Sequence, residues 1–342
     1  MRALIFGNRY FQFNESVGDA FRALGWAVSI LDYRDAAIEK TSSLNPYRKR
    51  KYRARFEEID RTLAAAIEAG KPDIFFTFSG NVILPARLRW MKERGLKLVL
   101  YLLDSIHTLP TTRSGLEFYD LVYAYEPTDI PFIAASNPRT AYLPPGYNPD
   151  FYRPLAGKEK IYDIAFVGTP YGGRLGLLNC LLKGAGRLDL RVALVGKYWH
   201  RGPRHRIFKL RYPSIYRYVL KNGTLTPPEV NRLYNQSRIV LNHHFIADGT
   251  GVNPRLFDIA GSSSFQLVDE RGKLAEMFAP SSEVETYSSV EELVEKARYY
   301  LDHPRAAKEI GRASGERARK EHTYLHRVRR ILADLARPPE IL

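Results

Sequence analysis

The stretch YDIAFVGTPYGGRLGLLNCLL, residues 162–182, runs from a short apolar segment through a turn with three glycines into a helix-like apolar pattern. This order is typical of one strand–turn–helix unit of a parallel sheet. Backbone N–H groups of such a turn can hold a phosphate, and a cation one turn into the helix can neutralise it. Gly168, Thr169 and Arg174 are the candidates. The Gly-Lys-Ser/Thr ending of a P-loop is absent, and a tight turn that needs glycine for its shape explains the pattern equally well.

The same alternation of apolar runs and amphipathic segments continues on both sides of this unit. Continuous apolar runs separated by helices favour a parallel sheet covered on both faces. We therefore expect an α/β protein with two Rossmann-like, doubly wound domains facing a cleft, in which ligands bind at the carboxyl ends of the strands. The expected strands are 3–6, 27–31, 73–78, 98–103, 121–125, 140–143, 161–167, 190–195, 239–242, 265–268 and 284–287, and the expected helices are 15–24, 47–68, 85–94, 128–135, 227–236, 255–260, 290–301 and two within 304–336.

A proline-rich segment, YLPPGYNPDFYRPLAGKEK, interrupts every periodic pattern at residues 142–160. A chain of 342 residues is long enough for two domains of ordinary size. The expected division is an N-terminal domain over 1–145, a linker over 146–160, a C-terminal domain over 161–320 and a last helical segment over 321–342.

The formal net charge of +15 favours anionic partners. Residues 47–55 hold six cations in nine positions, and residues 200–221 interleave bases with aromatic and aliphatic side chains. Each stretch suits a solvated helix face, and the second also suits an anionic membrane surface. Charge alone suggests nucleic acid, and no recognition motif supports it. One cysteine excludes an internal disulfide and favours a cytoplasmic location, with peripheral attachment at the inner face of the membrane as a further expectation.

A second candidate stretch is DGTGVNPRLFDIAG, residues 248–261. Its glycines let the backbone approach a ligand closely, and the following helix offers free N–H groups and a positive dipole end. An arginine there adds a full charge for a diphosphate, and an acid one turn inside can accept both hydroxyls of a ribose. A surface loop with an Arg–Asp helix pair is an equally good reading. The residues concerned are Gly249, Thr250, Gly251, Asn253, Arg255 and Asp258.

Polar residues also follow several predicted strands, where a ligand would bind. Gly7 and Asn8 follow the first strand, and Asp104 follows the strand at 98–103, with His107 shortly after it. Asp104 is a candidate to accept a proton from an acceptor hydroxyl, or else an N-cap. Asn242 ends the strand at 239–242. The two histidines after it point in opposite directions on a strand end, which argues against a shared metal.

From residue 142 to residue 335 the chain resembles the CgeB-like (spore maturation type) glycosyltransferases of the GT-B fold. The matching pieces, in order, are the linker, DIAFVGTP with Arg174, NGTLTPPEVNRLYNQSRIVLNHH, GVNPRLFDIAGSSSFQLVDE, ELVEKARYYLDHP and EHTYLHRVRRIL. The resemblance implies transfer of a sugar from a nucleotide diphosphate sugar, with UDP-sugar the expected donor and no bound metal or other cofactor.

By the same resemblance, Arg174 and Arg255 face the diphosphate and Asp258 holds the ribose. The N-terminal domain binds a glycan, lipid-linked or protein acceptor, for which a cell-envelope or other anionic molecule is expected, with Asp104 near the reacting sugar. The last helix crosses back onto the N-terminal domain.

Three positions depart from the family pattern. Asp258 replaces the usual Glu, Ser263 replaces a glycine, and Thr250 occupies the place of a second acid that many retaining members carry. Retention and inversion of the anomeric centre therefore both stay open. Two other functions also stay open: a nucleotide-sugar 2-epimerase and a non-catalytic nucleotide-sugar-binding protein.

Overall fold

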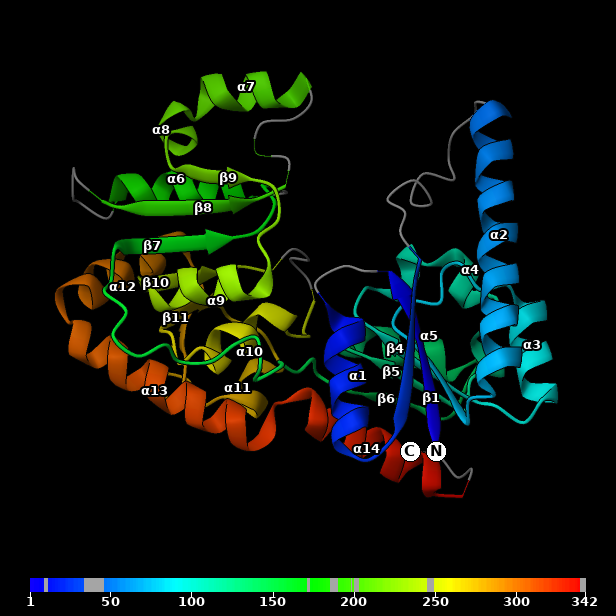
Figure 1. The fold of residues 1–342 in the computed structure, drawn as a ribbon. Helices are drawn as coiled ribbons and strands as arrows, with labels where there is room; N and C mark the ends of the chain where they lie inside the picture. Colours follow the sequence, from blue (N-terminus) through cyan, green and yellow to red (C-terminus); the bar gives the residue numbers. More distant parts are fainter. Residues whose placement is uncertain are drawn as a thin grey trace. The chain divides into compact units, whose positions relative to one another are not determined.

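The computed structural model describes residues 1–8, 12–33, 46–170, 173–184, 190–197, 199, 203–244 and 249–338, and it divides into two compact units (Figure 1). The first unit contains Met1–Pro145 together with Tyr324–Leu342, and the second contains Gly146–Thr323. The proline-rich segment 146–160 thus belongs to the second unit, and the last helix belongs to the first.

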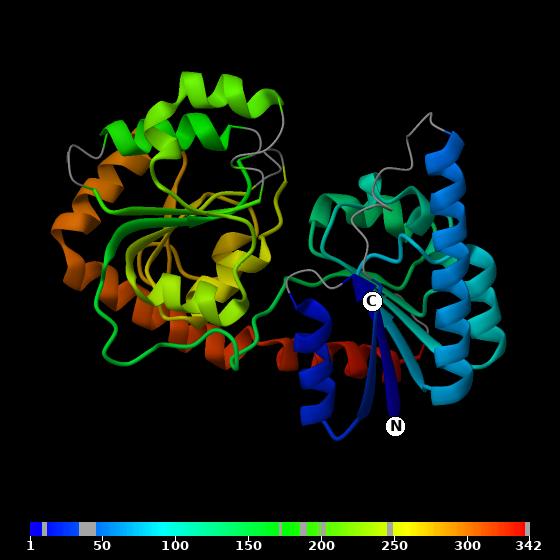
Figure 2. The ribbon, with the colours of Figure 1, turned by 45° about the horizontal axis from the view of Figure 1, so that its top comes forward.

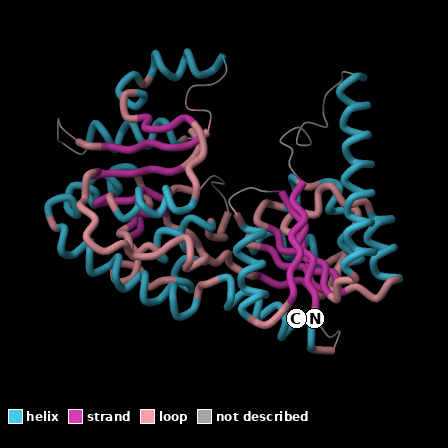
Figure 3. Tube along the Cα trace, viewed as in Figure 1, coloured by secondary structure: helices cyan, strands magenta, loops and turns pink. Residues whose placement is uncertain are grey.

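A six-stranded parallel sheet forms the centre of the first unit, in the order β2-β1-β3-β4-β5-β6 (Figure 3). Most residues of β3, β4 and β5 are buried, because helices cover both faces, and this explains their unbroken apolar runs. The strands are β1 Arg2–Asn8, β2 Ala27–Tyr33, β3 Ile74–Thr77, β4 Lys97–Leu102, β5 Leu121–Ala124 and β6 Thr140–Tyr142.

The helices of the first unit cover the two faces of this sheet separately (Figure 2). On one face lie α1 Phe13–Ala23 and α14 Tyr324–Ala336, and on the other α2 Pro46–Gly70 and α3 Pro85–Glu93. The predicted helix over 128–135 is wrong as one element. Pro127 begins one turn and Pro131 lies in the first turn of the next, where proline is favoured. The short elements are η2 Ile106–Thr108, α4 Pro110–Arg113, η3 Leu116–Phe118, η4 Pro127–Asp129 and α5 Ile130–Ala134.

Asp334 fixes α14 to the sheet of the first unit, although its side chain is fully buried. Its Oδ2 accepts a hydrogen bond of 2.7 Å from the hydroxyl group of Tyr123 on β5 and one of 2.5 Å from Nε of Arg330. We expect Asp334→Ala to lower the free energy of unfolding by about 3 kcal/mol, because it leaves a buried hydroxyl group without its acceptor. Urea unfolding measures this, with Tyr123→Phe and the double variant completing a mutant cycle. If the unfolding free energies lost in the two single variants add up to the loss in the double variant, the hydrogen bond between Tyr123 and Asp334 does not hold α14.

The second unit contains another parallel six-stranded sheet, in the order β12-β11-β10-β7-β8-β9. The first strand of this unit, β7, lies at the centre between β8 and β10. Successive strands are therefore added first on one side and then on the other, and the switch point lies between β7 and β10. The strands are β7 Tyr162–Val167, β8 Val192–Gly196, β9 Val219–Asn222, β10 Ser237–Asn242, β11 Gln266–Asp269 and β12 Glu285–Tyr287.

Helices again cover both faces of the sheet. Apolar side chains of α6, α8, α12 and α13 pack on one face, and those of α9 and α10 pack on the other. The sequence predicted no element between 196 and 226, and this is corrected: α7, α8 and the edge strand β9 lie there. Partial exposure of β9 explains why it has no apolar run. The helices are α6 Arg174–Gly184, α7 Pro203–Arg211, α8 Pro213–Tyr216, α9 Pro227–Asn235, α10 Pro254–Gly261, α11 Leu274–Met277, α12 Val290–Asp302 and α13 Pro304–Glu321.

Candidate functional site

The turn after β7 packs tightly against the turn after β8. The Gly168 amide donates to the carbonyl of Val195 at 2.8 Å. A Cβ on Gly196 would lie 2.0 Å from the carbonyl oxygen of Gly168, and a Cβ on Gly168 would lie 2.8 Å from the Phe166 ring. Both glycines are therefore required by packing. The same packing leaves the Arg255 guanidinium group next to Gly168, where a Cβ would be 3.4 Å from Nη2.

Two arginines converge on the Phe166 ring at the switch point. The guanidinium carbon of Arg174 lies 5.7 Å from the ring centroid and that of Arg255 lies 5.8 Å from it. Arg174 is buried, and it donates to the carbonyls of Thr169 at 3.0 Å and His243 at 2.8 Å. Burial, and after it the charge of Arg255, lower the pKa of Arg174 to about 10. Two like charges held this close raise the electrostatic potential at the site and favour an anionic ligand.

Asn242, the last residue of β10, connects this region to the start of α10. Its Oδ1 accepts from Nη1 of Arg255 at 3.2 Å and from Nδ2 of Asn253 at 2.9 Å. Asn253 is the N-cap of α10, because its Oδ1 accepts from the amide of Leu256 at 3.0 Å. The structure therefore brings together Asn242, Asn253 and Arg255, with Gly168 and Arg174 beside them.

Arg255 and Asp258 do not form the helix pair that was one reading of this stretch. Within the described ranges no salt bridge of Arg255 is found, and its guanidinium group points to Asn242 instead. The Asp258 side chain is half-buried one turn further along α10, and its carboxylate has no hydrogen bond to a described residue. Desolvation raises the pKa of Asp258 above its usual value, and Arg255 offsets only part of this rise. A group in this state gains from a ligand that donates hydrogen bonds.

A buried ion pair supports the loop before α10. Arg271 is buried; its Nη2 lies 2.7 Å from Oδ2 of Asp269, and its Nη1 donates to the carbonyl of Gly249 at 2.7 Å. The amide of Lys273 donates to the carbonyl of Thr250 at 3.0 Å. Gly251 is buried. Residues 249 and 250 of the loop are thus held by hydrogen bonds from the turn that follows β11. Asp248 lies outside the described residues.

His244 is part of this support. Its side chain is buried, with Nδ1 at 2.7 Å from Oδ1 of Asp269 and Nε2 accepting from the amide of Asn253 at 2.9 Å. Because Nε2 must accept, the ring proton lies on Nδ1 and the imidazole is neutral. His243 Nδ1 lies 3.0 Å from the Tyr287 hydroxyl. In the sequence, His243, His244, Asp269 and Tyr287 are recognisable only as polar residues at or just after the ends of predicted strands.

The neutral state of His244 predicts acid sensitivity of the second unit. Burial lowers the pKa of His244 and of His243 below the usual 6.5. Below about pH 6.5 the unfolded chain therefore binds protons that the folded chain does not. Asp269, whose pKa is lowered by its hydrogen bond from His244 and by Arg271 against the effect of burial, is ionised in both states in this range. The free energy of unfolding should therefore fall between pH 7 and pH 5, by up to about 1.4 kcal/mol per pH unit for each histidine.

Urea unfolding at several pH values measures this slope. His244→Gln, which does not titrate, should reduce the slope as well as the stability itself. Replacing the exposed His303 in the same way serves as the control for the loss of a histidine elsewhere in the unit. A slope that is equal in the wild type and in His244→Gln would contradict the buried neutral histidine.

The first unit places Asp104 on its surface after β4. The N-cap of η2 is Ser105, and the turn is fixed by the buried Asp129, which accepts from the Ile106 amide at 2.8 Å and the Ser105 hydroxyl at 3.1 Å. The alternative reading of Asp104 as a cap is therefore wrong. Its carboxylate has no hydrogen bond or salt bridge to a described residue. His107 is exposed, 3.6 Å from Asp129 through Nε2.

Gly7 and Asn8 end β1, beside the switch point of the first sheet between β1 and β3. A Cβ on Gly7 would lie 2.5 Å from Oδ1 of the buried Asn14, so packing requires this glycine. Asn14 Nδ2 donates to Asp32 at 2.6 Å and to the Asn8 carbonyl at 3.5 Å. Polar groups from β1, α1 and β2 thus meet at one sheet edge. Within the described ranges no hydrogen bond or salt bridge joins Gly7 or Asn8 to Asp104 or His107.

Comparisons with known proteins agree with the fold. Residues 177–333 match the family model described as glycosyl transferase-like. The structure is similar to the sucrose-phosphate synthase of Thermosynechococcus elongatus, with a TM-score of 0.68 and 13% identity over 98% of this chain and 99% of that one. It is also similar to an Escherichia coli structure described as trehalose-6-phosphate bound with UDP-2-fluoro glucose, with a TM-score of 0.65 and 13% identity over 99% and 100% of the two chains.

A putative UDP-N-acetylglucosamine 2-epimerase from Listeria monocytogenes shares the architecture less closely, with a TM-score of 0.53 and 12% identity over 94% of both chains. The two Rossmann-like sheets and these structural similarities show the GT-B fold, and the family model that matches residues 177–333 is a glycosyl transferase-like one. In sequence the chain is similar to the spore protein CgeB of Bacillus subtilis (strain 168), with 23% identity over 261 residues, which are 70% of this chain and 75% of that protein.

Proposed function

We propose that the second unit binds the donor, a nucleotide diphosphate sugar, at the switch point between β7 and β10. The observation that carries this proposal is the pair of guanidinium groups of Arg174 and Arg255 on the Phe166 ring, next to the β7 turn and the start of α10. In this position they neutralise the diphosphate and stabilise the charge that develops on it as the glycosidic bond breaks. The Escherichia coli structure with a similar fold is bound with UDP-2-fluoro glucose, and this supports UDP as the nucleotide.

Asp258 is the proposed ribose contact. It lies one turn beyond Arg255 on α10, half-buried and without a hydrogen bond to a described residue. The two hydroxyls of a ribose can donate to its two oxygens at once. This assigns the phosphate and the ribose to side chains three positions apart on one helix, whose cap, Asn253, is fixed by Asn242 and His244.

A nucleotide panel tests the donor site. We expect UDP to raise the melting temperature of the full chain, with GDP, CDP, TDP and ADP as comparisons. Arg255→Ala should abolish the shift, and the exposed Arg305→Ala on α13 is the matched control that should keep it. Failure of every nucleotide to shift the wild type would overturn the donor site.

Asp258→Asn tests the ribose contact separately. We expect it to weaken UDP binding about tenfold, because one carboxylate acceptor is lost, and to leave 2′,3′-dideoxy-UDP binding unchanged. Isothermal titration of both nucleotides to wild type and variant gives the four affinities. Equal losses for the two nucleotides would show that Asp258 acts on the fold of α10 and not on the ribose.

The first unit is proposed to bind the acceptor, with Asp104 as the base that removes the proton of its hydroxyl group. The support is that Asp104 is exposed at the carboxyl end of β4 and has no structural partner among the described residues. Direct displacement assisted by such a base inverts the anomeric centre. No group of three or more His, Cys, Asp or Glu side chains in the described ranges is arranged to hold a metal, and the arginines are the proposed counter-charge.

A nucleotide-sugar 2-epimerase is the second candidate, favoured only by the shared architecture. An epimerase needs no acceptor, so incubation of the enzyme with the donor alone distinguishes the two. A 2-epimer of the donor in the nuclear magnetic resonance spectrum would support the epimerase. Slow release of the free sugar with UDP would support the transferase.

A further inference from the structure

We propose that the surface formed by α7, α8 and β9, residues 203–222, docks this protein onto an anionic membrane. We call it the α7–β9 surface. None of the helices within the described ranges combines the length and the hydropathy that a bilayer-spanning helix needs, so the contact proposed is a peripheral one. The inference concerns a face that the donor site does not use, and it stands independently of the proposed function.

The first observation is that large apolar side chains are exposed here. Ile207 is 65% exposed, Leu210 is 83% exposed, and Leu220 on β9 is 54% exposed. Ile207 and Leu210 are three positions apart on α7 and therefore project from the same side of the helix. Leu210 is the most exposed of the large apolar side chains in the described ranges. Such exposure is costly in water unless a partner covers it.

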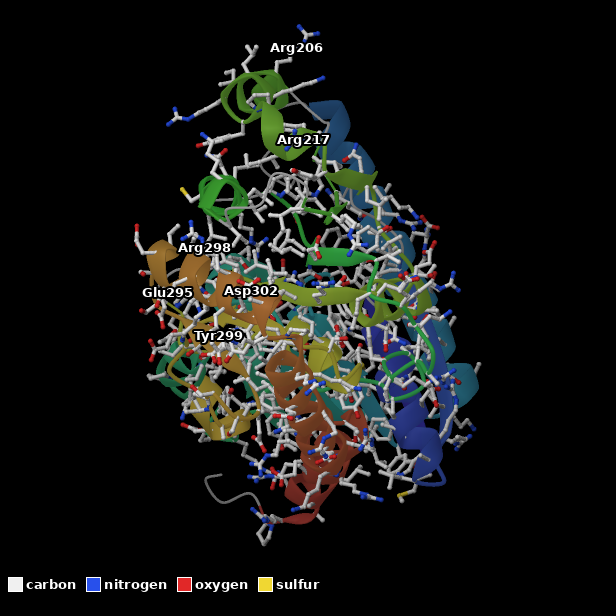
Figure 4. All side chains as sticks on the ribbon, turned by 90° about the vertical axis from the view of Figure 1, so that its left-hand side faces the viewer. Arg206, Arg217, Glu295, Arg298, Tyr299 and Asp302 are labelled. Carbon is white, nitrogen blue, oxygen red and sulfur yellow. The ribbon has the colours of Figure 1, made fainter. Side chains whose placement is uncertain are left out.

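The second observation is the charge around these side chains. Arg206, Lys209, Arg211 and Arg217 are exposed, and none of them forms a salt bridge within the described ranges. Arg211 and Arg217 instead contact the neighbouring rings of Tyr212 and Tyr218. The sequence contains no Asp or Glu from residue 190 to residue 228. Figure 4 shows Arg206 and Arg217 at the same end of the unit, with Arg206 projecting outward.

The third observation is that this surface has a rigid base. Ile215 of α8 is fully buried in the core of the second unit, together with Trp199, and Tyr212, Tyr218 and Val219 pack against that core. The exposure of Ile207 and Leu210 is therefore not the result of an unattached segment. The fold holds α8 and presents α7 beyond it.

The basic helix α2 shows what a solvated face looks like in the same chain. Arg53 pairs with Glu57 at 3.1 Å and Arg55 pairs with Glu58 at 2.8 Å, so these two charges are compensated along the helix. Lys221 of the α7–β9 surface pairs with Glu229 at 3.8 Å, but the four arginine and lysine side chains named above have no carboxylate partner in the described ranges and lie on the same surface as the exposed aliphatic groups. A soluble polyanion satisfies only the charge, whereas an anionic lipid surface also offers hydrocarbon to Ile207 and Leu210. The combination of exposed cations and exposed aliphatic side chains therefore favours an anionic membrane over a soluble polyanion.

Vesicle co-sedimentation of the full chain tests the charge requirement. We expect binding to vesicles of phosphatidylcholine with phosphatidylglycerol and little binding to phosphatidylcholine alone. Arg206→Gln with Lys209→Gln should weaken binding about tenfold or more, since each cation near an anionic surface contributes several-fold. Arg53→Gln with Arg61→Gln on α2 removes the same charge elsewhere and is the matched control. Equal loss in both pairs would mean that net charge alone drives adsorption, which overturns the site.

A second pair of variants tests the apolar contact. Ile207→Ser with Leu210→Ser keeps every charge, and we expect it to weaken vesicle binding at least tenfold. Both side chains are exposed, so the fold does not depend on them, and an unchanged melting temperature of the variant checks that the unit is intact. Unchanged vesicle binding, or tight salt-dependent binding of a short RNA that the serine pair leaves unaffected, would overturn the membrane proposal in favour of a polyanion.

Insertion is measured directly with a fluorescent probe. Cys180 is the only cysteine, so Cys180→Ser with Leu210→Cys gives one labelling position for an environment-sensitive dye. Anionic vesicles should shift its emission to the blue, whereas a dye at Glu309→Cys on the exposed side of α13 should not respond. A probe at 210 that stays in water while the protein sediments with vesicles would overturn the assigned surface.

Discussion

Arg255→Ala is expected to lower kcat/KM for sugar transfer about 100- to 1000-fold, a loss of about 3–4 kcal/mol of transition-state stabilisation. The reason is the position of the guanidinium group. It lies on the Phe166 ring, next to Gly168 and held by Asn242, and no described carboxylate neutralises it. A charge oriented in this way before the reaction needs little reorganisation as the diphosphate leaves.

Arg255→Lys separates charge from geometry in this prediction. Lysine keeps the charge but loses the planar fork that can bind two oxygens, so an intermediate loss is expected. Uridine without phosphates should bind equally to wild type, Arg255→Lys and Arg255→Ala. The measurement is the steady-state rate with a matching UDP-sugar, and Arg305→Ala again provides the control. If Arg255→Ala lowers the affinity for uridine as much as the affinity for UDP, Arg255 does not contact the diphosphate.

Asp104→Asn is expected to lower kcat about 100- to 10,000-fold, the range that general-base catalysis contributes. Asparagine keeps the size of the side chain and removes its ability to take a proton. Because Asp104 is exposed and supports no described turn, the melting temperature should not change, and neither should UDP binding to the second unit. The comparison of kcat, melting temperature and UDP affinity therefore isolates the chemical step.

The anomeric configuration of the product completes this test. Base-assisted direct displacement predicts inversion, read from the anomeric proton coupling in the product. Asp129→Asn is the contrasting variant, because Asp129 is buried and fixes the η2 turn. It should lower the melting temperature. Retention, or a loss of less than tenfold in kcat for Asp104→Asn, would remove Asp104 as the base.

Much of the fold was accessible from the sequence because buried parallel strands carry unbroken apolar runs. The strand–turn–helix pattern at 162–182 and its continuation on both sides predicted two Rossmann-like units, and these are confirmed by the sheets. The capping box of α9, formed by Thr226 and Glu229, is likewise a local feature, because both residues lie within one helical turn. By contrast, β9 is a partly exposed edge strand, and α7 exposes apolar side chains, so neither gave a periodic signal.

The sequence by itself determined which residue types lie at the strand ends, because strand lengths and turns are local. Only the tertiary structure decided their partners. Arg255 is three residues from Asp258 in the sequence, yet it bonds to Asn242, and His244 meets Asp269 from a neighbouring strand. The physical reason is that strand order and register are set by packing over the whole sheet. That packing brings the ends of β7, β10 and β11 together, and no local pattern records it.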